Sequence, residues 1–142
     1  MRVVILPTEQ EASDFAADFI EKLIIEKENA VLGLATGSSV LLTYEALIKK
    51  YQSGEMSFKN ITTFNLDEYI GLQPDHTQSY RHYMNWKLFN HIDIDHKKTY
   101  IPECFNKDYE SSCECYESKV RENGGIDLQL LGIGTNGHIG FN

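Results

Sequence analysis

The chain has 142 residues, of which 42% are hydrophobic and 24% are charged, and this composition is typical of one globular domain. A formal net charge of −8 disfavours nucleic acid and anionic membranes as partners, because both attract a basic surface. No run approaches the roughly 20 apolar residues of a membrane span, and residues 1–6 are too short for a secretory signal. The three cysteines contain no CxxC pair, so reduced thiols in a cytoplasmic protein are expected.

Strand and helix patterns alternate in the first part of the chain. Residues 2–6 form a short β-branched run that predicts a first strand. Thr8 and Glu11 have the spacing of a helix capping box. An apolar stripe on one helix face follows, made of Ala12, Phe15, Ala16, Phe19, Ile20, Leu23 and Ile24. Residues 30–35 predict a strand buried on both faces, as in a parallel sheet, and residues 41–48 predict a helix.

The second part of the chain continues the alternation. Residues 61–66 predict a strand, residues 79–90 an aromatic-rich helix, and residues 99–101 a short strand. A later helix that packs on the core is indicated by a stripe at Tyr109, Cys113, Tyr116 and Val120. Residues 126–131 predict the last strand. This order predicts one α/β domain over residues 1–142, with a doubly wound, mostly parallel, Rossmann-like sheet and helices on both faces.

Three polar loops follow predicted strands, at residues 36–39, 67–69 and 132–138. In doubly wound sheets, ligands bind beyond the carboxyl ends of the strands. We therefore expect the three loops to contribute to one site, provided that the strand order brings them together.

The first loop, Thr36-Gly-Ser-Ser39, joins a buried strand to a helix start. Free backbone N–H groups and hydroxyls at such a position can hold a phosphate, and Gly37 lets the backbone come close. The alternative is an ordinary helix start capped by serine. The loop is not a P-loop, since the lysine of that motif is missing.

The second loop contains Asp67 and Glu68. Adjacent residues of a strand point to opposite faces, so the two carboxylates are not expected to act as a pair. One carboxylate at a strand end can serve as a base on a carbon acid if burial raises its pKa. The alternative is a helix N-cap or a solvated turn.

The third loop, residues 132–138, matches the GxGxxG pattern of dinucleotide-binding proteins. That signal is weak here, because no clear amphipathic helix follows it. His138 is the more informative residue, since a glycine-rich loop offers its imidazole little to pack against and histidine suits proton transfer near neutral pH. The other histidines, at positions 76, 82, 91 and 96, show no metal-ligand spacing, so no metal is expected.

Four segments together resemble the glucosamine-6-phosphate deaminase family: LGLATGS (32–38), FNLDEYIGL (64–72), QSY (78–80) and LLGIGTNGHIGFN (130–142). They occur in the family's order and at similar spacing over nearly the whole chain. The sister family of 6-phosphogluconolactonases shares the fold and the glycine-rich loops, but it usually has an arginine after the Asp-Glu pair. Tyr69 and the run 139–142 therefore favour the deaminases.

The resemblance implies conversion of glucosamine 6-phosphate and water to fructose 6-phosphate and ammonia, without a cofactor. Asp67 matches the base that moves a proton from C2 to C1, and His138 matches the group that handles the proton of ring opening. Asn136 stands where some members carry an aspartate that orients this histidine, so it can accept a hydrogen bond but adds no charge. Substrate contacts are expected from Thr36, Gly37, Ser38, Ser39, Glu68 and Gly137.

The resemblance also implies that a complete member continues past residue 142. A glutamate of the active-site loop, basic phosphate ligands and further strands would follow there. We therefore expect a sheet that is incomplete at the C-terminal end and little activity from this chain alone. Three alternatives stay open: a nucleotide-binding module, a lactonase-like hydrolase, and an inactive phosphosugar-binding or assembly protein. Assembly as a homo-oligomer is open in every case.

Overall fold

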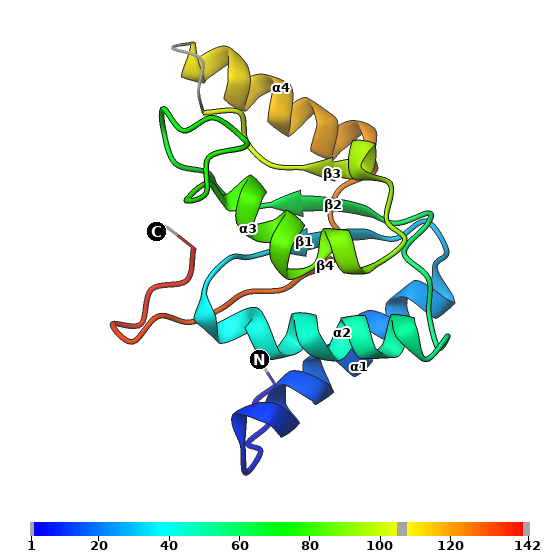
Figure 1. Ribbon diagram of the computed structural model, residues 1–142. Coiled ribbons are helices and arrows are strands. Elements are labelled where there is room, and N and C mark those ends of the chain that lie inside the picture. The colour runs from blue at the N-terminus through cyan, green and yellow to red at the C-terminus, as the bar shows by residue number, and fades with distance from the viewer. Residues whose placement is uncertain (1, 105–107, 141–142) are drawn as a thin grey trace.

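In the computed structural model, which describes residues 2–104 and 108–140, four parallel strands form one sheet (Figure 1). The sheet order is β3-β2-β1-β4, with β1 at Val31–Leu34, β2 at Thr62–Asn65, β3 at Thr99–Tyr100 and β4 at Leu128–Gln129. Each strand lies inside a segment that the sequence predicts to be a strand. Residues 141 and 142, at the end of the run that resembles the deaminases, lie outside the described residues.

Helices connect these strands. The α-helices of the described ranges are α1 Glu9–Glu26, α2 Leu41–Gln52, α3 Tyr80–Lys87 and α4 Tyr109–Glu122. Short 3-10 helices are η1 Ser38–Val40, η2 Phe89–His91 and η3 His96–Lys98. Figure 1 shows α4 beside β3, and α1 and α2 together on the opposite side of the molecule.

The order of the elements determines which face each helix covers. The chain runs β1-α2-β2-α3-β3 in one direction, and α4 then carries it back past β1 to β4. Because crossovers between parallel strands are right-handed, α4 lies on the face opposite to α2 and α3. Packing agrees, since Leu32, Tyr44 and Met84 share one buried cluster, whereas Phe64 meets Tyr116 of α4 with ring centroids 5.7 Å apart. The predicted doubly wound α/β class is therefore confirmed.

The winding direction reverses between β1 and β4. These strands pair in parallel, with Leu32 opposite Leu128 and Gly33 opposite Gln129. In open α/β sheets, ligands bind at such a switch point, beyond the carboxyl ends of the strands. The topology alone therefore directs attention to the segments that follow β1 and β4, which lie side by side in Figure 1.

Helix α1 begins at the predicted capping box. The Thr8 hydroxyl accepts the Glu11 N–H at 3.2 Å and donates to the Glu11 carboxylate at 2.9 Å, which holds the first turn from both sides. The buried face differs from the predicted stripe, since it consists of Ser13, Ala17, Ile20 and Ile24. Ala12 and Phe19 are exposed, because the orientation of the helix against α2 selects a face rotated from the most apolar one.

Two predictions about packing are wrong. Residues 2–6 form no strand, and Ile5 is 90% exposed. A β-branched run favours extended backbone, but a strand exists only where a partner backbone is available, and none of the four strands pairs with this segment. Helix α4 has no buried residue, and Cys113 is exposed, because the helix covers the sheet mainly through Tyr116.

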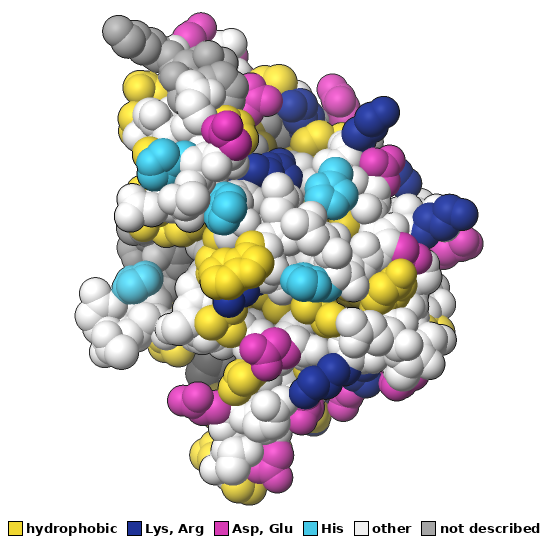
Figure 2. All heavy atoms as spheres, in the orientation of Figure 1, with side chains coloured by type: hydrophobic (Ala, Val, Ile, Leu, Met, Phe, Trp, Pro, Cys, Tyr) yellow, Lys and Arg dark blue, Asp and Glu magenta, His cyan; other side chains and the backbone are white. Residues whose placement is uncertain are grey.

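The face of the molecule in Figure 2 carries acidic and basic side chains side by side, without a basic patch in that view. Histidine side chains are separated from one another on it. No helix of the described residues is long and apolar enough to cross a bilayer.

Candidate active site

A cavity of about 530 Å³ opens at the carboxyl ends of β1, β2 and β4. Its lining includes Thr36, Gly37, Ser38 and Ser39 after β1, Asp67 after β2, and Thr135 and His138 after β4. The strand order thus brings the three polar loops to one place, as the sequence predicts. The cavity lies at the switch point of the sheet.

The loops after β1 and β4 touch because position 132 is a glycine. A Cβ atom built on Gly132 would overlap the Oγ of Ser39. The absence of a side chain at position 132 therefore leaves room for the Ser39 hydroxyl in its present rotamer, where the two loops meet at one side of the cavity.

The loop 36–39 lines the cavity and does not form a serine cap. Gly37 has a φ of +117°, which favours glycine, and its carbonyl accepts the hydroxyl of Tyr83 at 2.8 Å. Neither η1 nor α2 begins with a side-chain cap. The structure therefore does not support the alternative of an ordinary serine-capped start, and Ser38 and Ser39 line the cavity instead.

Asp67 lies at the end of β2 and is half buried in the lining of the cavity. Burial, and secondly the negative charge of Glu68, raise the pKa of Asp67 above its ordinary value. The residue does not cap a helix, since Ser79 caps α3. A carboxyl group with a raised pKa in a cavity is suited to proton transfer.

Glu68 points elsewhere. It is not part of the lining of this cavity, and both of its carboxylate oxygens accept backbone N–H groups, from Tyr69, Tyr80 and Arg81. The geometry therefore does not support Glu68 as a substrate ligand. Its side chain caps the start of α3.

Asn136 and His138 form a pair in the third loop. The His138 ring Nδ1 lies 2.5 Å from the Asn136 amide oxygen, which also accepts the His138 backbone N–H at 3.3 Å. Because a carbonyl oxygen can only accept, Nδ1 carries the proton and Nε2 is left as the acceptor of the neutral ring. Asn136 and Gly137 are not in the lining of the cavity, and Asn136 contacts His138, which is.

Local packing and a turn explain the glycines at positions 134 and 137. A Cβ atom on Gly134 would overlap the His138 ring, and Gly137 adopts a φ of +85° in a turn closed by its N–H and the Gly134 carbonyl at 2.8 Å. No helix follows β4 within the described residues, whereas dinucleotide binding places the pyrophosphate at a helix start. The loop geometry therefore gives the dinucleotide alternative no support.

Three tyrosines of the lining are missing from the sequence-based prediction. Tyr80 and Tyr83 stand one turn apart on α3, and the Tyr80 hydroxyl donates to that of Tyr69 at 3.2 Å. The spacing of the two helical tyrosines signals a shared face. That this face borders the cavity depends on how α3 packs, which the local pattern does not encode.

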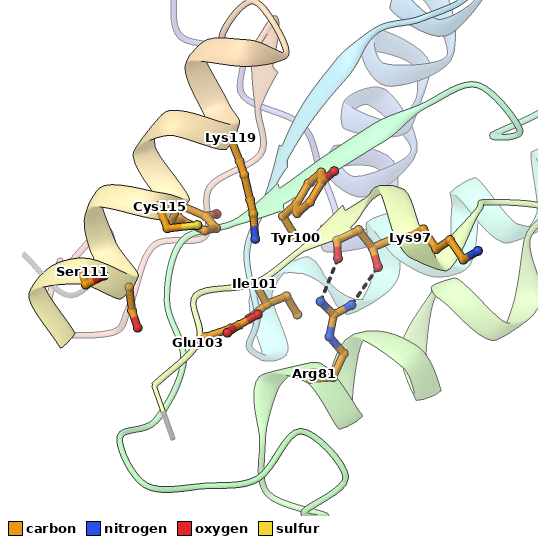
Figure 3. Close-up of a pocket in the computed structure, with 11 residues that line it drawn as sticks. Arg81, Lys97, Tyr100, Ile101, Glu103, Ser111, Cys115 and Lys119 are labelled. Carbon is orange, nitrogen blue, oxygen red and sulfur yellow. Dashed lines mark hydrogen bonds between the residues drawn. The ribbon is translucent and has the colours of Figure 1, made fainter. Parts of the chain in front are cut away.

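A second pocket, of about 380 Å³, lies between α3, β3 and α4 (Figure 3). It contains none of the residues of the three polar loops. The Arg81 guanidinium in this pocket donates to the Thr99 hydroxyl and carbonyl, both at 2.7 Å, so it joins α3 to β3. In the described part of the chain, no group of three or more His, Cys, Asp or Glu side chains gathers as metal ligands would.

Fold and cavity together define an α/β protein with a polar cavity at the switch point of a parallel sheet. The chain belongs to the family of glucosamine-6-phosphate isomerases/6-phosphogluconolactonase, whose model matches residues 8–140. It is 53% identical over 142 residues to glucosamine-6-phosphate deaminase of Thermoanaerobacter sp. (strain X514), covering all of this chain and 56% of that protein. The chain thus spans just over half the length of this relative.

Solved structures agree with this assignment. A monomeric glucosamine-6-phosphate deaminase is 48% identical and superposes with a TM-score of 0.95, over 99% of this chain and 58% of that one. The 6-phosphogluconolactonase of Thermotoga maritima is more distant, at 29% identity and a TM-score of 0.75, over 91% of this chain and 59% of the other. The likeness to the deaminases is therefore stronger in both sequence and shape.

Proposed function

We propose that this chain forms the larger part of a glucosamine-6-phosphate deaminase active site. The observation that carries the proposal is the single cavity lined by Thr36–Ser39, Asp67 and His138. A phosphate cradle, a carboxylate with a raised pKa and an oriented imidazole are the groups that this reaction requires. The names of the relatives point to the same substrate, glucosamine 6-phosphate.

The reaction needs only proton transfers and water. His138 assists the opening of the sugar ring, since its Nε2 is free to accept or return the proton of the ring hydroxyl. Asp67 then takes the proton from C2 and delivers it to C1, while one proton passes from the ammonium group to O1. C1 thereby becomes a CH₂OH group and a C=N bond forms at C2. Water adds to this bond and ammonia leaves, so that fructose 6-phosphate results. No oxidant or reductant is consumed.

Burial of Asp67 supports its role as the base. A carboxylate of ordinary pKa is too weak a base to take a proton from carbon efficiently, whereas one with a raised pKa is stronger. Thr36–Ser39 offers backbone N–H groups and hydroxyls to the phosphate, which would fix C1 and C2 at a constant distance from the base.

Binding of the phosphate is tested by NMR on the ¹⁵N-labelled chain. Fructose 6-phosphate should shift the amide signals of residues 36–39, while unphosphorylated fructose should leave them unchanged. Equal shifts with both sugars would contradict the phosphate cradle. Shifts at residues 132–137 on adding NAD would favour a dinucleotide site instead.

The reaction itself is tested on the protein as expressed from its own gene. Ammonia release from glucosamine 6-phosphate and exchange of the C2 proton with deuterated water should both be observed. Hydrolysis of 6-phosphogluconolactone without ammonia release would assign the chain to the lactonases.

A further inference from the structure

The Glu68 carboxylate is fully engaged by backbone donors. One oxygen accepts the N–H groups of Tyr69 and Tyr80, each at 2.8 Å, and the other accepts that of Arg81 at 2.9 Å. Two of these donors belong to the first turn of α3, where N–H groups have no partner inside the helix. A negative charge is also favourable at that end of a helix dipole.

Ser79 accepts further backbone N–H groups at the start of α3. Its hydroxyl accepts the His82 N–H at 3.0 Å, and its carbonyl accepts the Tyr83 N–H at 3.0 Å. The first turn of α3 therefore uses one local cap, Ser79, and one remote cap, Glu68. Because the remote cap comes from the segment that follows β2, it has a consequence that lies outside the helix.

That consequence is a connection between two walls of the cavity. Glu68 follows Asp67 directly, so its bonds hold the end of β2 against α3. The same helix carries Tyr80 and Tyr83, which line the cavity together with Asp67. On its other side, α3 is joined to β3 by the Arg81 side chain (Figure 3).

We propose that Glu68 is a positioning residue, which sets the place of Asp67 relative to the helix that carries Tyr80 and Tyr83. This inference rests on the proposed function, because it gives Asp67 the role of the base. Glu68 acts through the backbone and does not contact the substrate. It also acts through its charge, which is the second cause, after burial, of the raised pKa of Asp67.

Two substitutions separate the geometric and the charge effects. Glu68→Gln keeps the length but removes the charge, and its NH₂ group faces a backbone donor where an oxygen stood. Glu68→Asp keeps the charge but is one methylene too short to reach all three donors. Ser79→Ala is the matched control, since it removes the other cap of α3 and leaves residues 67–69 untouched.

Amide hydrogen exchange and the titration of the Asp67 carboxyl carbon are measured by NMR in all variants. In Glu68→Gln the Tyr80 and Arg81 amides should exchange at least about tenfold faster, and the pKa of Asp67 should fall. In Glu68→Asp the same amides should exchange faster while the pKa of Asp67 stays raised. Ser79→Ala should speed exchange at His82 without changing the pKa of Asp67. Wild-type values at Tyr80, Arg81 and Asp67 in Glu68→Gln would overturn the proposal.

Turnover adds a readout that a purely structural role would not move. In the protein as expressed from its own gene, Glu68→Gln should lower kcat for glucosamine 6-phosphate at least about tenfold and leave KM within about twofold, because the phosphate cradle is intact. Equal kcat in Glu68→Gln and wild type would overturn the proposal as well. Absence of turnover in the wild type would instead contradict the proposed function, and the NMR measurements would still decide the placement of Asp67.

Discussion

The Nδ1 atom of His138 lies 2.5 Å from the amide oxygen of Asn136, and this contact fixes the ring of a residue that lines the cavity. A carbonyl oxygen selects the tautomer with the proton on Nδ1. An aspartate would select the same tautomer and would add a negative charge that favours the imidazolium. Asn136 therefore supplies orientation without charge.

Replacing Asn136 by alanine should reduce turnover about tenfold or more, because the ring loses the partner that orients it. Stability should change little, since both side chains are exposed. Turnover is measured as ammonia release, and the orientation of the ring as the ¹⁵N shifts that report its tautomer. Asn136→Asp is the control, because it keeps the acceptor. If alanine and aspartate variants have equal turnover, the contact does not matter for the reaction.

Gly134→Ala should displace the His138 ring without altering the remainder of the sheet. The added methyl group would occupy the space of the imidazole, so the ring must turn away from the cavity. We expect a loss of turnover comparable to that of Asn136→Ala and unchanged shifts for residues 36–39 with fructose 6-phosphate. Gly134 does not have a positive φ, so the expected cause is the clash and not backbone strain; Gly54→Ala, at a φ of +79° in open space, shows what strain does without a clash. A Gly134→Ala variant with wild-type turnover would contradict the packing described for this loop.

Asp67→Asn should lower turnover at least about a hundredfold and at the same time stabilise the chain at neutral pH. The pKa of Asp67 is raised in the fold, chiefly by burial, so its ionisation costs stability above the folded-state pKa. At low pH the carboxyl is neutral in both states and the cost disappears. Thermal melting of both proteins should therefore show a higher Tm for the variant at pH 7 and nearly equal Tm values near pH 3. A lower Tm for the variant at pH 7 would show that the charge of Asp67 is stabilised rather than penalised.

The pKa of Asp127 is shifted in the direction opposite to that of Asp67. Its carboxylate oxygens accept hydrogen bonds from the Lys27 ammonium group at 2.7 and 2.8 Å, and one of them also accepts the Val31 N–H at 2.8 Å. These bonds join the end of α1 to β1 and β4. Lys27, and secondly the Val31 amide, lower the pKa of Asp127. A depressed pKa means stability that is present above about pH 4 and lost as pH falls through the folded-state value.

Asp127→Asn should therefore lower the free energy of unfolding at pH 7 by about 1 kcal/mol, a modest value because the pair is partly exposed. The difference from the wild type should shrink below pH 4. Urea titrations at both pH values measure it. Asp75→Asn, at an exposed loop position, provides a comparison with no partner removed among the described residues. A difference that stays constant with pH would contradict the ionic origin.

Local signals in the sequence predict most of the elements. Thr8 and Glu11 mark the start of α1, and the apolar runs 30–35 and 61–66 contain β1 and β2. These predictions succeed because capping and double-sided burial depend on residues close together in the chain. Residues 2–6 and Cys113 show the opposite case, since pairing and burial depend on segments far away.

The sequence by itself determined which groups the proposed chemistry can use: a hydroxyl-rich loop at residues 36–39, a carboxylate at position 67 and an imidazole at position 138. Only the tertiary structure decided that they share one cavity, because the strand order that places β1 between β2 and β4 is a property of the whole sheet. It also decided the separate tasks of two neighbouring carboxylates. Asp67 lines the cavity and Glu68 caps α3, because beyond the end of β2 at Asn65 the chain bends and the two side chains meet different surroundings.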